Sequence, residues 1–423
     1  MTATAPTRRV GVGGAVGIGL GSMLGAGVFV VWGPAAAAAP GTLVAAVAIA
    51  GAVAAINAGS SAQLAAVHPV AGGAYAYGRA ELGPWPGFVA GLAFVLGKTA
   101  SIAAIALAVG AYLWPGHAAF VGTIAIVGAW NLNSRGVTRT SAAAVVLASC
   151  VVSVLTVLII TLALQSSWSF GWFAYAPIQQ PLAVAGTEWP GGTLQAAALL
   201  FFAFAGYARI ATLGEEVKEA ARTIPRAIAI ALSVVVVIYG SLAIVLPHAL
   251  GTALADLAAP ISAAAATTWI PSWVIVVAAI AAAFGSLLAL TAGVGRTAMA
   301  MAREGDLPRP LARANGHGVP ALAESVAAVV AIGLVWAGGL TFAIAMSAFA
   351  VLLYYAVANA AAWRASRVGH IATWRMPWPI SALGLILCVA LALWLPIAAV
   401  VVATGVLVLG VAVRAVSRLT SRE

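Results

Sequence analysis

Two short, glycine-interrupted segments inside long apolar runs carry the residue types and spacing that could do chemistry. In the first, Gly25 and Gly27 flank Ala26, and two glycines so close together make a helix easy to unwind. In the second, Gly206 follows a run of aromatic and small residues, Phe201, Phe202, Ala203 and Phe204. Unwound backbone leaves N–H groups that attract a carboxylate, and carbonyl groups beside aromatic faces that can receive an ammonium group. Together the two segments favour binding of a zwitterion, that is, of an amino acid, although glycine packing alone is the alternative for the first segment.

Two cations, Lys98 and Arg209, lie within apolar runs. A cation at the centre of a bilayer costs about 2.5–3.5 kcal/mol on insertion scales, so Lys98 needs a partner or a wet cavity. Three roles stay open for Lys98: a proton carrier, a fixed charge that faces the substrate, or a structural cation in place of a sodium ion. Arginine stays protonated in proteins, so Arg209 is expected to snorkel or to form a gate near the cytoplasmic mouth, or else to line the substrate route.

No Asp or Glu lies near the middle of any apolar run. A cationic substrate would meet Lys98 and Arg209 without a counter-ion, so we expect neutral amino acids first and anionic ones second. Glu215 and Glu216 are interpreted as a solvated helix end, with a cytoplasmic gate formed with Arg296 or Arg303 as the alternative. Neither an HExxH motif nor a Cys/His spacing is present, so no metal site and no cofactor is expected.

The composition shows what must position these residues. Of 423 residues, 63% are hydrophobic and only 7% are charged, whereas soluble domains carry about 25% charged residues. This excludes a soluble enzyme, a disordered regulator and a secreted disulfide scaffold, and it predicts a multi-pass protein embedded in a lipid bilayer that does not bind nucleic acid. About twelve apolar runs are long enough to span; they lie near 10–33, 42–66, 87–113, 117–132, 141–164, 193–213, 227–250, 271–301, 320–337, 341–363, 379–395 and 396–414.

The positive charges predict the topology. If both termini are cytoplasmic, 18 of the 20 Lys and Arg residues fall on the cytoplasmic side and the opposite loops hold none, as the positive-inside rule requires. We expect the cytoplasmic membrane as the location. The two glycine-interrupted segments are five spans apart, an odd number, so they enter the membrane from opposite sides, which is typical of an inverted repeat with discontinuous helices.

Three stretches resemble the amino acid–polyamine–organocation (APC) superfamily of permeases. They are Gly21–Phe29, the segment from Phe201 through Gly214–Lys218 to Arg222–Ile228, and Gly295–Pro308. The resemblance implies an all-α LeuT-type fold, with two inverted five-helix repeats, discontinuous helices 1 and 6, and two further helices. We therefore expect one transporter domain over 1–423, divided into repeats at 10–164 and 193–363, extra helices at 379–414 and a tail at 415–423.

The resemblance also implies a substrate site between the broken helices. The substrate α-carboxylate would meet Gly25, Ala26 and Gly27, and its α-amino group the carbonyls around Phe201–Phe204. Two departures prevent the coupling mechanism from being carried over. Ala208 stands where many members have an acid, and the fifth span has no lysine, whereas the third has Lys98.

These observations predict a secondary transporter and not an enzyme. We expect alternating-access transport of neutral amino acids driven by a proton gradient, with an exchanger or exporter of amino acids or amines as the alternative. No GxxxxGK[ST] loop is present, so ATP is not expected to drive transport, and nothing supports sodium coupling. An intramembrane enzyme would need paired acids or a His/Ser constellation at depth, and the sequence shows none. The sequence does not give the oligomeric state.

Overall fold

The computed structural model describes residues 10–25, 27–68, 72–136, 141–165, 191–211, 213, 217–369 and 375–420. Within these residues the chain is built from helices, and the β-structure found there is one isolated bridge between Val10 and Val217. Nine of the described helices or helix groups are long and apolar enough to cross a membrane, and two shorter ones are also apolar. The protein is therefore a multi-pass membrane protein, as its composition predicts.

The predicted spans are present as helices. The first span is divided into α1 (Val12–Met23), α2 (Gly27–Val30) and α3 (Trp32–Ala38), and the sixth into α9 (Gly191–Phe204), the 3₁₀ turn η2 (Ala205–Tyr207) and α10 (Ala208–Ala211). The others are α4 (Leu43–Val67), α6 (Pro84–Leu113), α7 (Ala118–Ser134), α8 (Ser141–Gln165), α11 (Ala220–Leu250), α13 (Ser272–Arg303), α14 (Ala321–Ala337), α15 (Gly339–Val368), α16 (Trp378–Leu393) and α17 (Ile397–Thr420).

Two short helices lie where the sequence suggested only loops. Helix α5 (Gly73–Leu82) joins α4 to α6, and α12 (Pro260–Ala266) lies between α11 and α13. Helix α5 is ten residues long and buries Tyr75 and Tyr77 on one side, so a search for 20-residue apolar runs does not detect it. Three further 3₁₀ turns follow α6, α11 and α13: η1 (Pro115–His117), η3 (Gly251–Asp256) and η4 (Arg309–Ala312).

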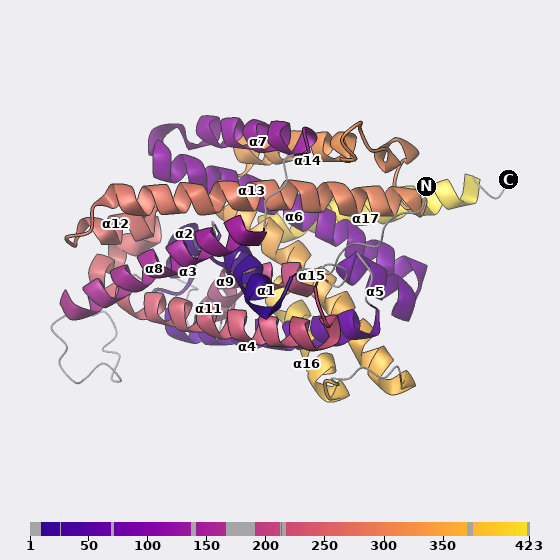
Figure 1. Cartoon of the computed structure of the whole chain (residues 1–423), viewed down its shortest axis with the longest axis horizontal. Helices are drawn as coiled ribbons and strands as arrows, with labels where there is room; N and C mark the ends of the chain where they lie inside the picture. Colours follow the sequence, from indigo (N-terminus) through magenta and orange to yellow (C-terminus); the bar gives the residue numbers. More distant parts are fainter. Residues whose placement is uncertain are drawn as a thin grey trace.

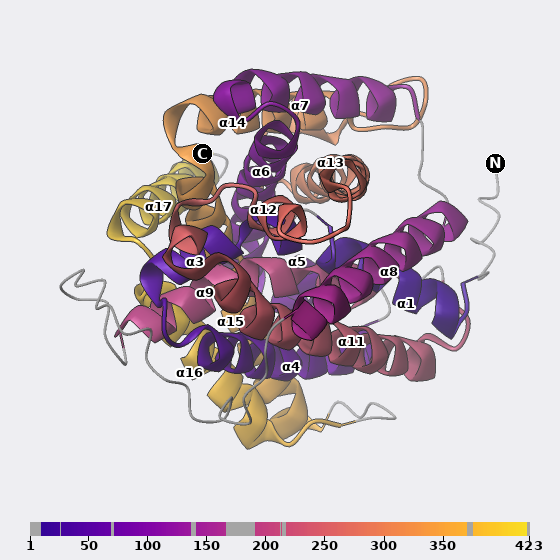
Figure 2. The ribbon, with the colours of Figure 1, turned by 90° about the vertical axis from the view of Figure 1, so that its left-hand side faces the viewer.

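Helix α6 lies inside the molecule and packs against α15, α13 and α7 (Figure 2). Of its apolar segment, 83% is buried, compared with 28% in α8 and 22% in α17, so α8 and α17 have much of their surface open to lipid. Small residues permit this central position, because they let neighbouring backbones approach closely. A Cβ atom at Gly110 would lie 2.2 Å from the carbonyl oxygen of Ala118 in α7.

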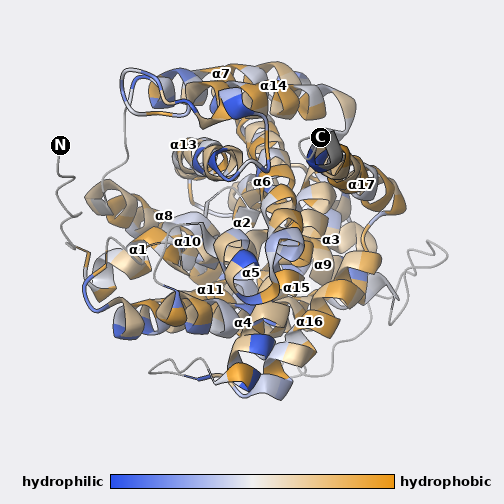
Figure 3. Cartoon of the chain, turned by 90° about the vertical axis from the view of Figure 1, so that its right-hand side faces the viewer, coloured by the Kyte–Doolittle hydropathy of each residue, from blue (hydrophilic) through white to orange (hydrophobic). Residues whose placement is uncertain are grey.

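The two ends of the long axis differ in charge. Helix α5 and the end of α17 lie at one end, and α12 lies at the other (Figure 1). Arg79, Asp306 and Arg414 meet at the first end, which we call the basic end, and polar residues gather around α5 there (Figure 3). The segment from Leu257 to Ala266 meets Pro115 at the other end, which we call the neutral end. The separation of charge along the chain is thus also a separation in space.

Candidate functional site

The first span is divided near Gly25. Helix α1 ends at Met23, and the Leu24 N–H still bonds the Leu20 carbonyl at 2.7 Å. Ala26 lies outside the described residues. The helix resumes at Gly27, and α2 and α3 follow one another almost without interruption, because the Val31 N–H bonds the Gly27 carbonyl at 3.1 Å. The predicted break is therefore confined to the glycine-flanked segment.

The sixth span changes its helix type at the predicted position. Helix α9 ends at Phe204, and the chain tightens into the 3₁₀ turn η2 around Gly206. A 3₁₀ turn shifts hydrogen bonds from i−4 to i−3 carbonyls. The interruption therefore leaves carbonyl groups near Ala203 without their α-helical partners.

The two interruptions touch each other through glycine. A Cβ atom at Gly206 would lie 2.4 Å from the carbonyl carbon of Ser22, and one at Gly27 would lie 2.9 Å from the Cα of Ala203. Real side chains do not approach backbone so closely, so neither position has space for a larger residue. The two broken helices are therefore in direct backbone contact, which we call the break junction.

A tyrosine from the seventh span connects the break junction. The Tyr239 hydroxyl lies 2.7 Å from the Met23 carbonyl oxygen and 3.3 Å from the Ala203 carbonyl oxygen, so it can donate its proton to either broken helix. Tyr239 is fully buried. We did not predict a role for this residue from the sequence, although it is the one tyrosine of the seventh span.

Ser286 of α13 provides an unsatisfied polar atom beside the first break. Its Oγ is buried and has no hydrogen-bond partner in the described structure. A Cβ atom at Gly25 would lie 2.2 Å from this Oγ, so the hydroxyl lies directly against the break. Buried hydroxyls without a partner are uncommon, and the position suits a hydrogen bond to a bound molecule. Sequence reasoning missed Ser286, because serine recurs in many of the spans.

The aromatic residues of the sixth span have different surroundings. Phe202 and Ala203 face Gly27 at the break junction. Phe201 instead packs edge-on against Tyr355 of α15, and Phe204 against Tyr239, with ring centroids 6.0 and 4.8 Å apart. Of the predicted aromatic contacts to an ammonium group, Phe202 is the one whose ring reaches the first break.

Lys98 is buried in α6 with 8% of its surface exposed. Within the described part of the chain no carboxylate forms an ion pair with it. Its neighbour Gly97 faces α15. One turn further along α6, the Ser101 hydroxyl lies 2.7 Å from the Ser347 hydroxyl of α15. A buried ion pair is therefore not what holds this lysine among the described residues.

The predicted gate residues lie near the basic end of the sixth span and of α13. Arg209 is half-buried in α10, while Arg296 and Arg303 are exposed on α13. Glu215 and Glu216 lie outside the described residues, so their pairing with either arginine is untested. Val10 lies beside this region, because the Lys218 N–H bonds its carbonyl at 3.0 Å and thereby connects the start of the first span to the loop after the sixth.

A different ion-pair network closes the basic end. The Asp306 carboxylate, fully buried, pairs with Arg79 at 2.8 Å and with Arg414 at 2.5 Å, and Arg418 is 3.5 Å away. The Tyr75 hydroxyl also donates to Asp306 at 3.0 Å. Burial and the adjacent carboxylate raise the pKa of Tyr75 above its usual value, so Tyr75 remains a donor. Asp306 thereby ties α5 and α17 to the end of α13.

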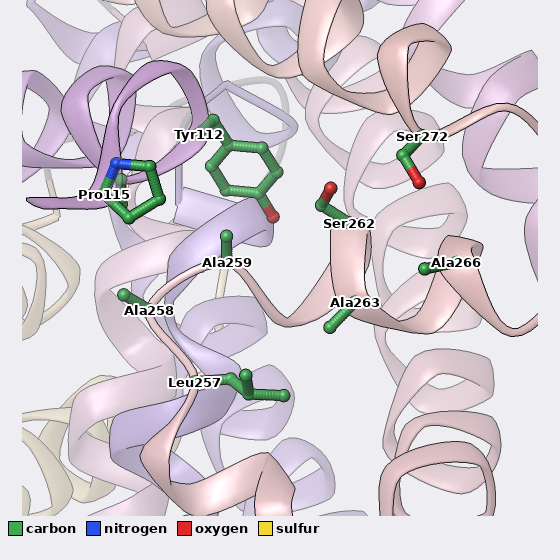
Figure 4. Close-up of a pocket in the computed structure, with 10 residues that line it drawn as sticks. Tyr112, Pro115, Leu257, Ala258, Ala259, Ser262, Ala263, Ala266 and Ser272 are labelled. Atoms are coloured by element: carbon green, nitrogen blue, oxygen red, sulfur yellow. The ribbon is translucent and has the colours of Figure 1, made fainter.

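A pocket of about 370 Å³ opens at the neutral end. Figure 4 shows Tyr112 and Pro115 on one side and the Leu257–Ala266 segment with Ser272 on the other. The Tyr112 hydroxyl donates to the Phe29 carbonyl of α2 at 2.8 Å. Tyr112 therefore connects the pocket to α2 at Phe29, two residues after Gly27.

The chain matches known proteins along most of its length. The family described as amino acid permease matches residues 11–413. An uncharacterized transporter of Mycobacterium tuberculosis is 44% identical over 98% of this chain and 92% of its own length. The branched-chain amino acid permease of Bacillus subtilis is 25% identical over 70% of this chain and 68% of its own length. A protein named cationic amino acid transporter 7, chloroplastic, of Arabidopsis thaliana is 29% identical over 65% of this chain and 50% of its own length.

A solved structure shares the fold. The crystal structure of a mutant manganese transporter of Eremococcus coleocola has a TM-score of 0.61 and 14% identity, and the match covers 100% of this chain and 99% of that chain. At this level of identity the likeness is one of fold alone. The LeuT-type fold implied by the sequence is therefore confirmed.

The break junction predicts a sharp effect of one methyl group. Gly206→Ala should destabilise the protein by about 1–3 kcal/mol, because the added Cβ overlaps fixed backbone atoms of Ser22 and Met23. Gly240→Ala in α11 is the matched control, because nothing lies within 4 Å of a Cβ there. Thermal unfolding of the purified variants measures both changes. Equal unfolding midpoints for the two variants would contradict the close contact.

The network at the basic end predicts a second effect. Asp306→Asn should destabilise the protein by about 3–5 kcal/mol, because it leaves Arg414 buried without its carboxylate partner. Glu304→Gln, at a side chain that is 56% exposed, should change stability by at most about 1 kcal/mol. Thermal unfolding of the purified variants compares the two changes. A change of at most about 1 kcal/mol in Asp306→Asn would contradict a stabilising role of this network.

Proposed function

The chain belongs to the amino acid permease family of transporters, and on that premise we propose that it moves neutral amino acids across the cytoplasmic membrane by alternating access, coupled to protons. In this proposal the basic end is cytoplasmic, as are both termini. The break junction is the observation that carries the proposal. It brings an unwound segment, a 3₁₀ turn and an unsatisfied serine hydroxyl to one place inside the membrane.

The chemistry of the break junction suits a zwitterion. The segment from Gly25 to Gly27 begins the short helix α2–α3, whose N-terminal N–H groups favour a carboxylate. The Ser286 hydroxyl lies against Gly25 and can donate to the same carboxylate. On the opposite side, the carbonyls near Ala203 and the face of Phe202 can receive an ammonium group. We therefore propose that the substrate site is formed by the predicted segment Gly25–Gly27 together with Phe202, Ala203 and Ser286.

Charge selects between neutral and cationic amino acids. The names of two relatives point in different directions, to branched-chain and to cationic amino acids. Lys98 is a buried cation without a carboxylate partner among the described residues, and Asp306 at the basic end is already shared by arginines. A second cation in the interior would therefore be repelled, which favours neutral substrates.

Lys98 is proposed as the group that couples transport to protons. No carboxylate among the described residues pairs with it, so a structural ion pair does not explain why a lysine is buried at this position. A buried amine can lose and regain its proton, unlike Arg209. Loading and release of that proton would bias the equilibrium between the two access states.

Uptake by the purified protein in proteoliposomes tests the proposed function. Labelled neutral, acidic and basic amino acid pools are offered with and without an inward proton gradient. We expect uptake of the neutral pool, stimulated by the gradient. Uptake that requires preloading with substrate would instead indicate exchange, and uptake of the basic pool alone would contradict the charge argument.

Substitution of Lys98 tests the coupling role. Lys98→Gln removes the proton-carrying group with little change in length, so gradient stimulation of uptake should disappear while exchange between preloaded and external substrate continues. Lys98→Arg keeps the charge but cannot release its proton, and it should lose stimulation in the same way. Stimulation retained in Lys98→Arg would show that Lys98 acts as a fixed charge.

A further inference from the structure

A second buried polar region lies beside the break junction, between α4, η2, α15 and α16. We call it the tyrosine–asparagine cluster, and its members are Asn57, Tyr207, Tyr354, Tyr355, Asn359 and Cys388. Each is at most 2% exposed. Tyr207 directly follows Gly206, so the cluster starts where the sixth span is interrupted.

The cluster is connected but incomplete. The Asn359 amide donates to Asn57 Oδ1 at 2.6 Å, and the Cys388 thiol donates to the same oxygen at 3.2 Å. The Tyr207 ring stacks on the Tyr355 ring with their centroids 5.1 Å apart, and the centroids of the Tyr354 and Tyr355 rings are 4.3 Å apart. The Tyr355 hydroxyl lies within reach of weak hydrogen bonds to Tyr207 and Tyr354, and Tyr207 within reach of Asn57, but none of the three hydroxyls has a partner in good hydrogen-bonding geometry.

The unsatisfied atoms are concentrated in this place. Nine buried side-chain polar atoms lack a hydrogen-bond partner in the described chain, and five of them belong to the cluster: Asn57 Nδ2, Asn359 Oδ1 and the hydroxyls of Tyr207, Tyr354 and Tyr355. Buried polar groups in proteins are normally satisfied by protein or by ordered water. The five atoms include donors and acceptors but no charge, which suits water rather than an ion.

Polar side chains continue from the cluster towards the basic end along α4. The Ser60 and Ser381 hydroxyls are 3.1 Å apart, and the Gln63 amide donates to the Ser366 hydroxyl at 2.8 Å. At the end of this line His68 and Glu81 are 2.6 Å apart. Asn57, Ser60 and Gln63 recur every three residues, so they lie on one side of α4.

The other side of the cluster packs against α6, the helix that carries Lys98. Tyr354 packs against Phe94 of α6, with ring centroids 5.6 Å apart. Lys98 lies four residues after Phe94 and therefore on the same side of α6. The titratable or charged groups along this line include Lys98 and Cys388 on the inner side. At the basic end they include His68, Glu81, Arg364, which donates to the Glu81 carbonyl, and Arg375, which donates to the Ser366 carbonyl.

We propose that the tyrosine–asparagine cluster binds internal water, and that this water carries protons between Lys98 and the His68–Glu81 pair. The transport part of the inference rests on the proposed proton-coupled function. Each water or hydroxyl oxygen accepts one proton and passes another to its neighbour, so the cluster keeps its own protons and charge. A proton that leaves the Lys98 ammonium is matched by one released at the basic end.

Removal of hydroxyl groups tests the proton route. In proteoliposomes, gradient-driven uptake of labelled L-leucine and L-alanine is compared with exchange of the same amino acids between preloaded vesicles and medium. Tyr354→Phe/Tyr355→Phe should slow gradient-driven uptake about tenfold and leave exchange unchanged, because exchange needs no net proton movement. Tyr112→Phe, which removes a buried hydroxyl outside the cluster, should leave the ratio of the two rates unchanged. An unchanged ratio in the double variant would overturn the proton route.

A map of the wild-type protein that resolves ordered water tests the water site without a substrate. We expect water within hydrogen-bond distance of Asn57 Nδ2, Asn359 Oδ1 and at least one of the three hydroxyls. Hydroxyls bonded directly to one another, with no water between them, would overturn the site. A wild-type protein that takes up neither probe under a gradient would overturn the proposed coupling and the proton route, whereas the map decides separately whether the cluster binds water.

Discussion

Two helices that are interrupted inside a membrane leave backbone groups that lipid cannot hydrate, and the rest of this structure depends on that constraint. Irregular backbone at this depth is tolerated where protein buries it or where it lines a polar cavity. Here Gly206 and Gly27 bring the two breaks into backbone contact, and Tyr239 lies within hydrogen-bonding distance of a carbonyl from each. Helices α4, α8, α11 and α15 pack against the two broken helices. The Ser286 hydroxyl stays unsatisfied beside the first break, and we propose that a substrate uses it.

Charged side chains are distributed unevenly between the basic end and the interior. The acidic residue Asp306 is buried at the basic end, where it holds α5, α13 and α17 together through arginines. Lys98 lies far inside α6 without a described carboxylate partner. This arrangement holds the ends of three helices together and leaves Lys98 in the interior. The preference for neutral amino acids that we propose follows from this distribution of charge.

The sequence predicts the spans and the breaks well, because each depends on local residue types. Apolar length identifies α4 or α13, and two glycines two residues apart identify the break after Met23. Contacts between distant segments could not be predicted in this way. Asn57 and Asn359 are 302 residues apart along the chain and yet hydrogen-bonded. Phe201 and Phe204 pack against Tyr355 and Tyr239, which belong to other helices. Helix α5 was not predicted, because its ten residues are too few to form an apolar run that spans a membrane.

The most direct test of the account is a map of the protein with a bound neutral amino acid. The account predicts that the substrate carboxylate lies against the backbone of Gly25–Gly27 and the Ser286 hydroxyl, and that its ammonium group faces Phe202 and the carbonyls near Ala203. Density for the amino acid in the pocket beside Tyr112 alone, with an empty break junction, would contradict it.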